Sequence, residues 1–159
     1  MTYVENAVRL AQASDIPQIV ALINRAFAVE YFFKSGDRTN PEQVRDMMAA
    51  GIFLLLEDGD QLAACVWVKI TGERGYIGTL SVDHARQRSG LGRRMMQQAE
   101  DYCRSAGCKV LDIRIVNLRT ELPPIYHKFG FVATGTQSAE MIKNATRPIH
   151  FINMSKRLL

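Results

Sequence analysis

Apolar residues recur along this chain with two kinds of spacing, one typical of helices and one typical of strands. Spacings of three and four residues mark residues 16–27 and 91–106, so each segment is expected to bury one face of a helix. Ser14 is expected to cap the first of these helices. Two shorter helices are predicted over 41–50 and 123–129, because both begin with proline and are followed closely by glycine.

Short runs of apolar or alternating residues predict strands at 8–11, 52–57, 61–70, 76–82, 109–117, 130–135 and 150–158. Asp58 and Gly59 form a strong hairpin signal, so the second, third and fourth runs are expected to form an antiparallel meander. The helix over 91–106 then crosses over to the fifth run, which places that strand parallel to the fourth. The order β-α-α-β-β-β-α-β-α-β-β predicts an α/β fold with a mixed sheet, in a single domain spanning 1–159. The last run is expected to offer an edge to a second subunit, giving a monomer or a homodimer.

Composition narrows the class of protein. A chain of 159 residues with 47% hydrophobic and 23% charged residues can fold around a core, which excludes a disordered protein. Its richest apolar run, Ile52 to Leu56, is too short to cross a membrane, and the N-terminus has no signal-peptide pattern. Cys65, Cys103 and Cys108 lack the spacing of a metal site. Reduced thiols suit the cytoplasm, where the protein is expected to reside.

Much of the net charge of +4 lies in one glycine-bearing segment, with four arginines between positions 86 and 94. This segment stands between a predicted strand and a predicted helix, where free backbone N–H groups and a helix N-terminus attract a phosphate. A local cluster fits a small polyphosphate ligand better than a nucleic acid. The glycine spacing matches neither a Walker loop, which needs a lysine, nor a complete Rossmann fingerprint, because Met95 stands at the third glycine position.

Residues 87–92, QRSGLG, fit a third pattern, Q-x-x-G-x-G between a strand and a helix. In this context the chain resembles the GNAT superfamily of acyl-CoA N-acyltransferases. YIGTLSV (76–82) resembles the fourth strand of that family, VLDIRIVN (110–117) the fifth, and IYHKFGFVATG (125–135) a signature segment. VRLAQASDIPQIVALI (8–23) resembles its opening strand and helix. The resemblance covers essentially the whole chain and implies the GNAT fold.

The resemblance also implies acetyl-CoA as co-substrate and no metal. In the family, backbone N–H groups of the glycine loop hold the pyrophosphate, and glycines at 90 and 92 let it approach closely. Arg86, Arg88 and Arg93 or Arg94 are then available for the remaining phosphate charge. Backbone groups of the fourth strand pair with the pantetheine amides, as an added strand does. The implied binding residues are Leu80, Val82, Gln87, Arg88, Ser89, Gly90, Leu91, Gly92, Arg93, Asn117 and Tyr126.

Family chemistry is the direct attack of a neutral amine on the acetyl thioester. By resemblance, the N–H of about Leu80 stabilises the developing oxyanion, and Tyr126 donates a proton to the departing thiolate. The fourth strand has no acidic residue, so the general base stays unassigned. Its candidates are a water relay, Glu30, Asp112, Glu121 and His127. His84 and His127 are too far apart in sequence to indicate a metal, and no cysteine has a paired histidine.

In the family, the acceptor approaches over the first helix–loop–helix and the last strands, here 27–38 and 134–149. Tyr31, Phe32 and Phe33 suggest an apolar wall of the acceptor site. Glu30 with Asp37 favours a cationic amine such as a polyamine, whereas Arg114 favours an acceptor with a carboxylate. Both acceptor classes stay open at this point.

The sequence therefore predicts an acetyl-CoA-dependent N-acetyltransferase that acts on a primary amine of a small molecule or peptide. One alternative is a non-catalytic GNAT-like protein that binds acyl-CoA as a sensor. A second is a basic nucleic-acid-binding domain, which would bind any polyanion in a salt-sensitive manner. No nucleic acid or membrane partner is expected, since the sequence carries no recognised nucleic-acid module.

Overall fold

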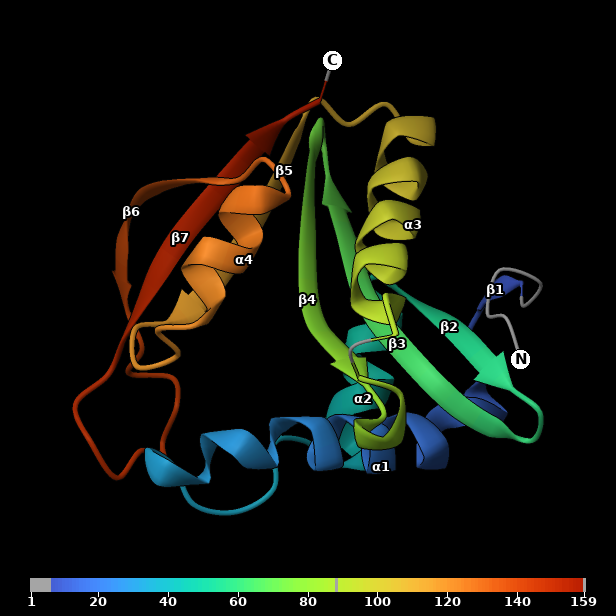
Figure 1. Ribbon diagram of the computed structural model, residues 1–159, viewed down its shortest axis with the longest axis horizontal. Coiled ribbons are helices and arrows are strands. Elements are labelled where there is room, and N and C mark those ends of the chain that lie inside the picture. The colour runs from blue at the N-terminus through green and yellow to red at the C-terminus, as the bar shows by residue number, and fades with distance from the viewer. Residues whose placement is uncertain (1–6, 88, 159) are drawn as a thin grey trace.

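The computed structural model describes residues 7–87 and 89–158, which form a seven-stranded sheet with helices on both faces (Figure 1). The strands are β1 (Val8–Leu10), β2 (Ile52–Asp58), β3 (Gln61–Thr71), β4 (Arg74–Val82), β5 (Val110–Val116), β6 (Val132–Ser138) and β7 (His150–Arg157). The α-helices are α1 (Ile16–Ala26), α2 (Pro41–Ala50), α3 (Leu91–Ser105) and α4 (Leu122–Lys128). Short 3₁₀ helices are η2 (Ala13–Asp15), η3 (Phe27–Phe32) and η4 (His84–Arg86). The order of strands and α-helices confirms the prediction.

The sheet opens between its two central strands. Its order is β1-β2-β3-β4-β5-β7-β6, and β4 and β5 are the parallel pair that the crossover helix predicted. Within the described chain, that pairing is confined to residues 74–76 of β4 and 110–112 of β5. Beyond it the two strands diverge like the arms of a V (Figure 1). We call this opening the fork.

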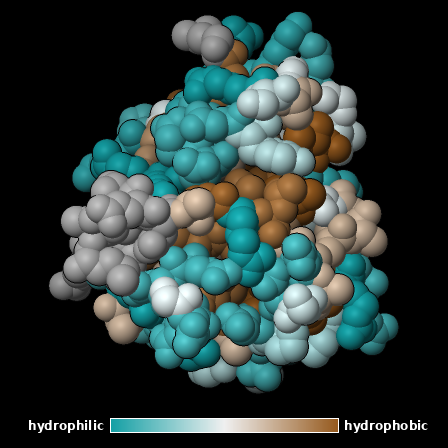
Figure 2. Space-filling model, turned by 90° about the vertical axis from the view of Figure 1, so that its right-hand side faces the viewer, coloured by the Kyte–Doolittle hydropathy of each residue, from teal (hydrophilic) through white to brown (hydrophobic). Residues whose placement is uncertain are grey.

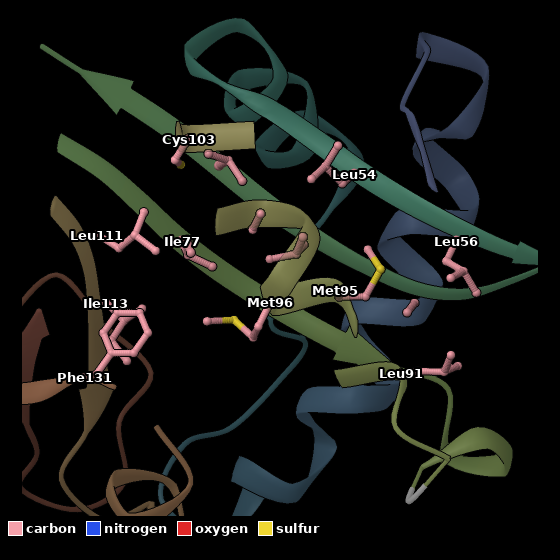
Figure 3. Close-up of a cluster of buried hydrophobic side chains, with 14 of the residues drawn as sticks. Leu54, Leu56, Ile77, Leu91, Met95, Met96, Cys103, Leu111, Ile113 and Phe131 are labelled. Carbon is pink, nitrogen blue, oxygen red and sulfur yellow. The ribbon is translucent and has the colours of Figure 1, made fainter. Parts of the chain in front are cut away.

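Alternate residues of β2 bury opposite faces of the sheet. Leu54 and Leu56 join the core under α3, while Phe53 and Leu55 join a second core under α1 and α2. Figure 3 shows Met95 and Met96 of α3 among the side chains that fill the first core. Half-buried side chains of α4 pack against the same core, so α3 and α4 lie on one face of the sheet. The two helices therefore flank the fork.

The surface around α3 and the N-terminal strand is mostly polar. Figure 2 looks at this flank and shows apolar surface at the centre of the face within a hydrophilic surround.

Cys65, Cys103 and Cys108 are buried and unpaired, as expected for core thiols. Among the helices of residues 7–87 and 89–158, none combines the length and apolarity needed to span a bilayer.

Three local predictions need correction. Ser14 lies inside η2 and does not cap α1, because the N-cap position of α1 is Asp15. The Asp15 carboxylate accepts a hydrogen bond from the Gln12 N–H (2.7 Å) and pairs with Arg9. The buried stripe of α3 continues to Cys103, whereas Ala106 lies beyond the helix end and is exposed. Strand β7 is not an edge, because β6 returns antiparallel and covers it.

A carboxylate fastens the closed end of the fork. Asp112 of β5 accepts hydrogen bonds from the Arg74 guanidinium (2.7 and 2.8 Å) and from the Ser155 hydroxyl (2.6 Å). Burial on its own raises the pKa of Asp112, but the hydrogen bonds from Arg74 and Ser155 outweigh it, so the pKa lies below its ordinary value. Asp112 thus joins β4, β5 and β7 where the fork closes.

Asp112→Asn is expected to lower the free energy of unfolding by about 1 kcal/mol at pH 7, a modest amount because Arg74 is largely exposed. Since the folded-state pKa is depressed, the carboxylate stabilises the fold above its unfolded-state pKa, and this contribution is lost as pH falls through the folded-state pKa. Urea denaturation at pH 7 and at stepwise lower pH should therefore show wild type and variant converging in acid. A difference that grows in acid would contradict this assignment.

Candidate active site

A cleft of about 1030 Å³ occupies the fork. Both arms contribute to it, with Leu80 and Val82 from β4 and residues 113–116 from β5. Tyr126 of α4 and Gly92 of α3 also line it. The fork thus brings together the predicted strand, glycine loop and tyrosine.

Strand β4 is distorted where it lines the cleft. Trp67 pairs with Gly78 and Cys65 with Ser81, so two β4 residues, Thr79 and Leu80, oppose one residue of β3. Thr79 has a φ of +48°, which is strained for a β-branched residue. Its buried hydroxyl has no hydrogen-bond partner in the described part of the chain. The strained backbone and the unpartnered hydroxyl of Thr79 are features of this bulge that the sequence pattern did not reveal.

The glycine loop leaves room for an anion at the start of α3. Gly90 is the N-cap of the helix with a φ of +83°, and a Cβ built there would meet no atom within 4 Å. At Gly92 the nearest atom to such a Cβ is the Val82 Cγ2, at 3.9 Å. Helix N-terminal N–H groups and this open space together suit a phosphate group. The residues present therefore fit the pyrophosphate site expected from the sequence.

Other predicted loop residues have more varied positions. Gln87 lines the cleft, and its Nε2 donates a hydrogen bond to the Val82 carbonyl (3.3 Å). The Ser89 hydroxyl donates to the Arg86 carbonyl. Leu91 is 2% exposed, so its side chain belongs to the core. Arg88 lies outside the described residues.

Arg86 and Arg93 both line the cleft, but Arg86 is held in ion pairs. Arg93 lines the cleft, with its guanidinium 5.8 Å from the Phe129 ring centroid. Arg86 was expected to be available for a phosphate, but it pairs with Asp58 (2.9 Å) and Asp83. These two carboxylates offset its charge and anchor the loop to the β2–β3 turn.

Tyr126 stands half-buried in an aromatic setting. Its ring packs edge-on against Phe129 (6.1 Å between centroids) and Phe131 (6.0 Å). Burial raises the pKa of the Tyr126 phenol; the positive charge of Arg119 opposes this rise and nearby Tyr76 adds to it. The phenol therefore keeps its proton at neutral pH. Tyr76, which also lines the cleft, was expected to be a strand residue but not a site residue.

Only some of the acceptor residues predicted from the sequence line the cleft. Phe27 and Glu30 line the cleft, because positions three apart lie on one side of the 3₁₀ helix η3. Tyr31 and Phe32 are 52% and 47% exposed, and Phe33 is buried in a small core cluster, so none of the three lines the cleft. The wall expected from these three aromatics is instead supplied by Phe27 and by Phe151 of β7.

Glu30 is buried between two cations. Its carboxylate lies 2.8 Å from the Arg119 guanidinium and 3.6 Å from the Lys34 ammonium. Arg119 also pairs with Glu121 at 2.9 Å. The two carboxylates at this point of the cleft are therefore held in ion pairs.

The remaining candidates lie away from the cleft lining. Asn117 accepts a hydrogen bond from the His150 N–H (2.9 Å), which ties the end of β5 to β7. His127 contacts the Phe131 carbonyl at 3.3 Å. Asp112 is hydrogen-bonded to Arg74 and Ser155 at the closed end of the fork.

Over residues 7–87 and 89–158 there is no group of three or more His, Cys, Asp or Glu side chains placed to hold a metal ion.

A sequence model of the Acetyltransferase (GNAT) family matches residues 16–131, from α1 to the start of β6. The chain belongs to this family. A solved GNAT acetyltransferase from Elizabethkingia anophelis with acetyl-CoA bound superimposes with a TM-score of 0.78, at 17% identity, over 96% of this chain and 98% of that chain. At this identity the likeness establishes the GNAT fold.

Two curated GNAT relatives are similar in sequence. Glucosamine 6-phosphate N-acetyltransferase 1 of Oryza sativa subsp. japonica is 25% identical over 140 residues, covering 82% of this chain and 83% of that protein. Mycothiol acetyltransferase of Propionibacterium freudenreichii is 25% identical over 132 residues, covering 77% of this chain. The match spans only 41% of the length of the mycothiol enzyme.

Gly92→Leu is expected to weaken acetyl-CoA binding without lowering the stability of the fold. Leucine favours a helix over glycine by about 0.8 kcal/mol, and the space beside Gly92 is open, so the melting temperature should not fall. The added side chain should occupy the cleft and raise the Kd for acetyl-CoA at least about 10-fold, the effect of losing about 1.4 kcal/mol. Calorimetric titration and thermal unfolding measure the two effects. Unchanged affinity would remove the glycine loop from the binding site.

Proposed function

We propose that this GNAT protein is an acetyl-CoA-dependent N-acetyltransferase that acts on a primary amine of a small molecule or peptide. The observation that carries the proposal is the fork, in which β4 beyond Tyr76 has no β5 partner among the described residues. The unpaired strand leads through η4 into the glycine loop at the start of α3, and Tyr126 lines the same cleft. The acetyl-CoA bound to the GNAT protein of the same fold supports this choice of co-substrate.

In this proposal the glycine loop and the unpaired part of β4 bind different parts of acetyl-CoA. N–H groups of residues 87–92 hold the pyrophosphate at the helix N-terminus. Leu80 and Val82 pair with the amides of the pantetheine arm, as an added strand would. Arg93, stacked on Phe129, is placed for further phosphate charge, a role also proposed for Arg88.

Acetyl-CoA supplies an activated acetyl group in its thioester. The Leu80 N–H donates to the carbonyl oxygen of that thioester while the acceptor nitrogen attacks the carbonyl carbon. A C–N bond forms and the C–S bond breaks, and Tyr126 gives its phenolic proton to the leaving sulfur. The Tyr126 phenolate then regains a proton from water, since its raised pKa favours the neutral phenol. The excess proton of the amine passes to water in the open cleft, since Glu30 and Glu121 are held in ion pairs.

The same ion pairs favour a second candidate, a sensor that binds acyl-CoA without turnover. A sensor needs the loop and the fork but no residue that accepts a proton. Thiol release from acetyl-CoA, measured across amines, amino acids, aminoalkyl phosphates, polyamines and short peptides, separates the two candidates. Saturable turnover with one amine class supports the enzyme. Binding of acetyl-CoA without thiol release on any acceptor supports the sensor, and absence of binding overturns both.

A further inference from the structure

The part of the cleft that lies away from the glycine loop has an excess of positive charge. We call it the acceptor end. There Glu30 and Glu121 are matched by Lys34 and Arg119 in ion pairs. The other charged groups that line this end are Asp37, Arg38, Arg114 and Lys143. Three cations thus face one carboxylate, a balance that suits an anionic ligand.

Arg38 and Arg114 are held in place by aromatic rings. The Arg114 guanidinium lies 4.4 Å from the Phe151 ring centroid, and the Arg38 guanidinium lies 5.3 Å from that of Phe27. Among the residues that the structure describes, neither guanidinium has a carboxylate within 4 Å. Both arginines line the cleft, so their positive charge is presented to a ligand there. Two such guanidinium groups make a ready site for an oxyanion.

Tyr76 lines the same cleft as these two arginines. Burial raises the pKa of Tyr76, while the positive charges of Arg114 and Arg38 act in the opposite direction. The Arg114 guanidinium lies 5.9 Å from the Tyr76 ring centroid, and Tyr126 lines the same cleft as both residues. An acceptor whose anionic group binds these arginines therefore lies in the same cleft as the proposed acid.

We propose that the acceptor is a small primary amine that also carries a carboxylate or phosphate, and that Arg38 and Arg114 hold this anionic group. The inference rests on the proposed acetyl transfer. It disfavours a polyamine, since the buried carboxylate of Glu30 is already neutralised by Lys34 and Arg119. Both anionic groups offer the same chemistry to a guanidinium pair, and the acceptor set distinguishes them.

Matched acceptors test the charge preference. Each amino acid is paired with its carboxamide, and each aminoalkyl phosphate with the corresponding amino alcohol. A carboxamide has the less basic amine, so without an anion site it should react at least as well as the acid. Selective thiol release with the acids indicates a carboxylate, and selective release with the phosphates indicates a phosphate.

Arg114→Gln and Arg38→Gln test the assignment to residues. Each should raise the KM for the anionic amine about 10- to 100-fold, as expected for loss of a charge-assisted hydrogen bond. The KM for acetyl-CoA should stay unchanged, and Arg114→Lys should recover part of the loss. Arg45→Gln, an exposed change on α2 outside the cleft lining, is the matched control.

A binding measurement decides the inference even without turnover. Trp67 is the only tryptophan of the chain, lines the cleft and packs edge-on against Tyr76 (6.0 Å between centroids). Its fluorescence should respond saturably to the anionic member of a pair in the presence of coenzyme A, and Arg114→Gln should abolish this response. Equal or stronger responses to neutral or cationic amines, or no response to any anionic amine, would overturn the inference. Thiol release with neutral amines alone would overturn it too, while upholding the acetyltransferase.

Discussion

Tyr126→Phe is expected to lower kcat about 100- to 1000-fold, within the range for loss of a general acid. The departing sulfur then leaves without its proton donor, while the aromatic ring keeps its packing against Phe129 and Phe131. The KM for acetyl-CoA should change by no more than about twofold, because the phenol oxygen acts in the chemical step. Steady-state thiol release with the preferred amine measures both constants.

Tyr102→Phe is the matched control for this change. Tyr102 is a half-buried tyrosine of α3 that does not line the cleft, and the substitution removes the same single hydroxyl. Its kcat should equal that of wild type. A Tyr126→Phe enzyme that keeps half or more of its kcat would show that another group protonates the sulfur.

Glu30→Ala is expected to lower the free energy of unfolding by about 3–5 kcal/mol, as found when one partner of a buried ion pair is removed. The side chains of Glu30, Lys34 and Arg119 are only 7%, 6% and 13% exposed, so two cations would stay buried without their shared carboxylate. Burial and the charge of Arg38 already lower the pKa of Lys34, and Glu30 opposes both. Urea denaturation at pH 7 measures the loss.

Two further variants serve as the control and the partial rescue for Glu30→Ala. Glu73→Ala breaks the Lys109–Glu73 pair, whose side chains are 72% and 64% exposed, and should change stability by no more than about 1 kcal/mol. Replacing Glu30 and Lys34 together with methionine should recover much of the loss, because one buried cation is removed as well. A Glu30→Ala protein as stable as Glu73→Ala would mean that the buried pair contributes nothing.

Features fixed by neighbouring residues could be predicted from the sequence. The Asp58-Gly59 hairpin, the glycine loop at residues 87–92 and the tyrosine helix each depend on a few consecutive positions. The crossover rule then placed β5 parallel to β4, which is the geometry that allows a fork. Residues that depend on local structure therefore reached the cleft as expected, as Gln87, Gly92 and Tyr126 did.

Contacts between distant segments could not be predicted in this way. Nothing in residues 27–33 indicated a 3₁₀ helix, whose period places Phe27 and Glu30 at the cleft in place of Tyr31–Phe33. Arg86 was assigned by its neighbours in sequence, but its carboxylate Asp58 lies 28 positions away. Arg38 lay within the expected acceptor segment 27–38, but its position at the cleft, stacked on Phe27, depends on the fold. Long-range pairing of charges is the part that required the structure.

Hydrogen–deuterium exchange with and without acetyl-CoA tests most directly whether the fork between β4 and β5 is the acetyl-CoA site. On its β5 side, β4 is unpaired from Ile77 to Val82 within the described chain, so amides there should exchange quickly in the free protein. Acetyl-CoA should slow exchange in peptides covering residues 77–82 and 87–93 and leave β1, which does not line the cleft, unchanged. Protection elsewhere, with none at β4 or the glycine loop, would contradict the assignment.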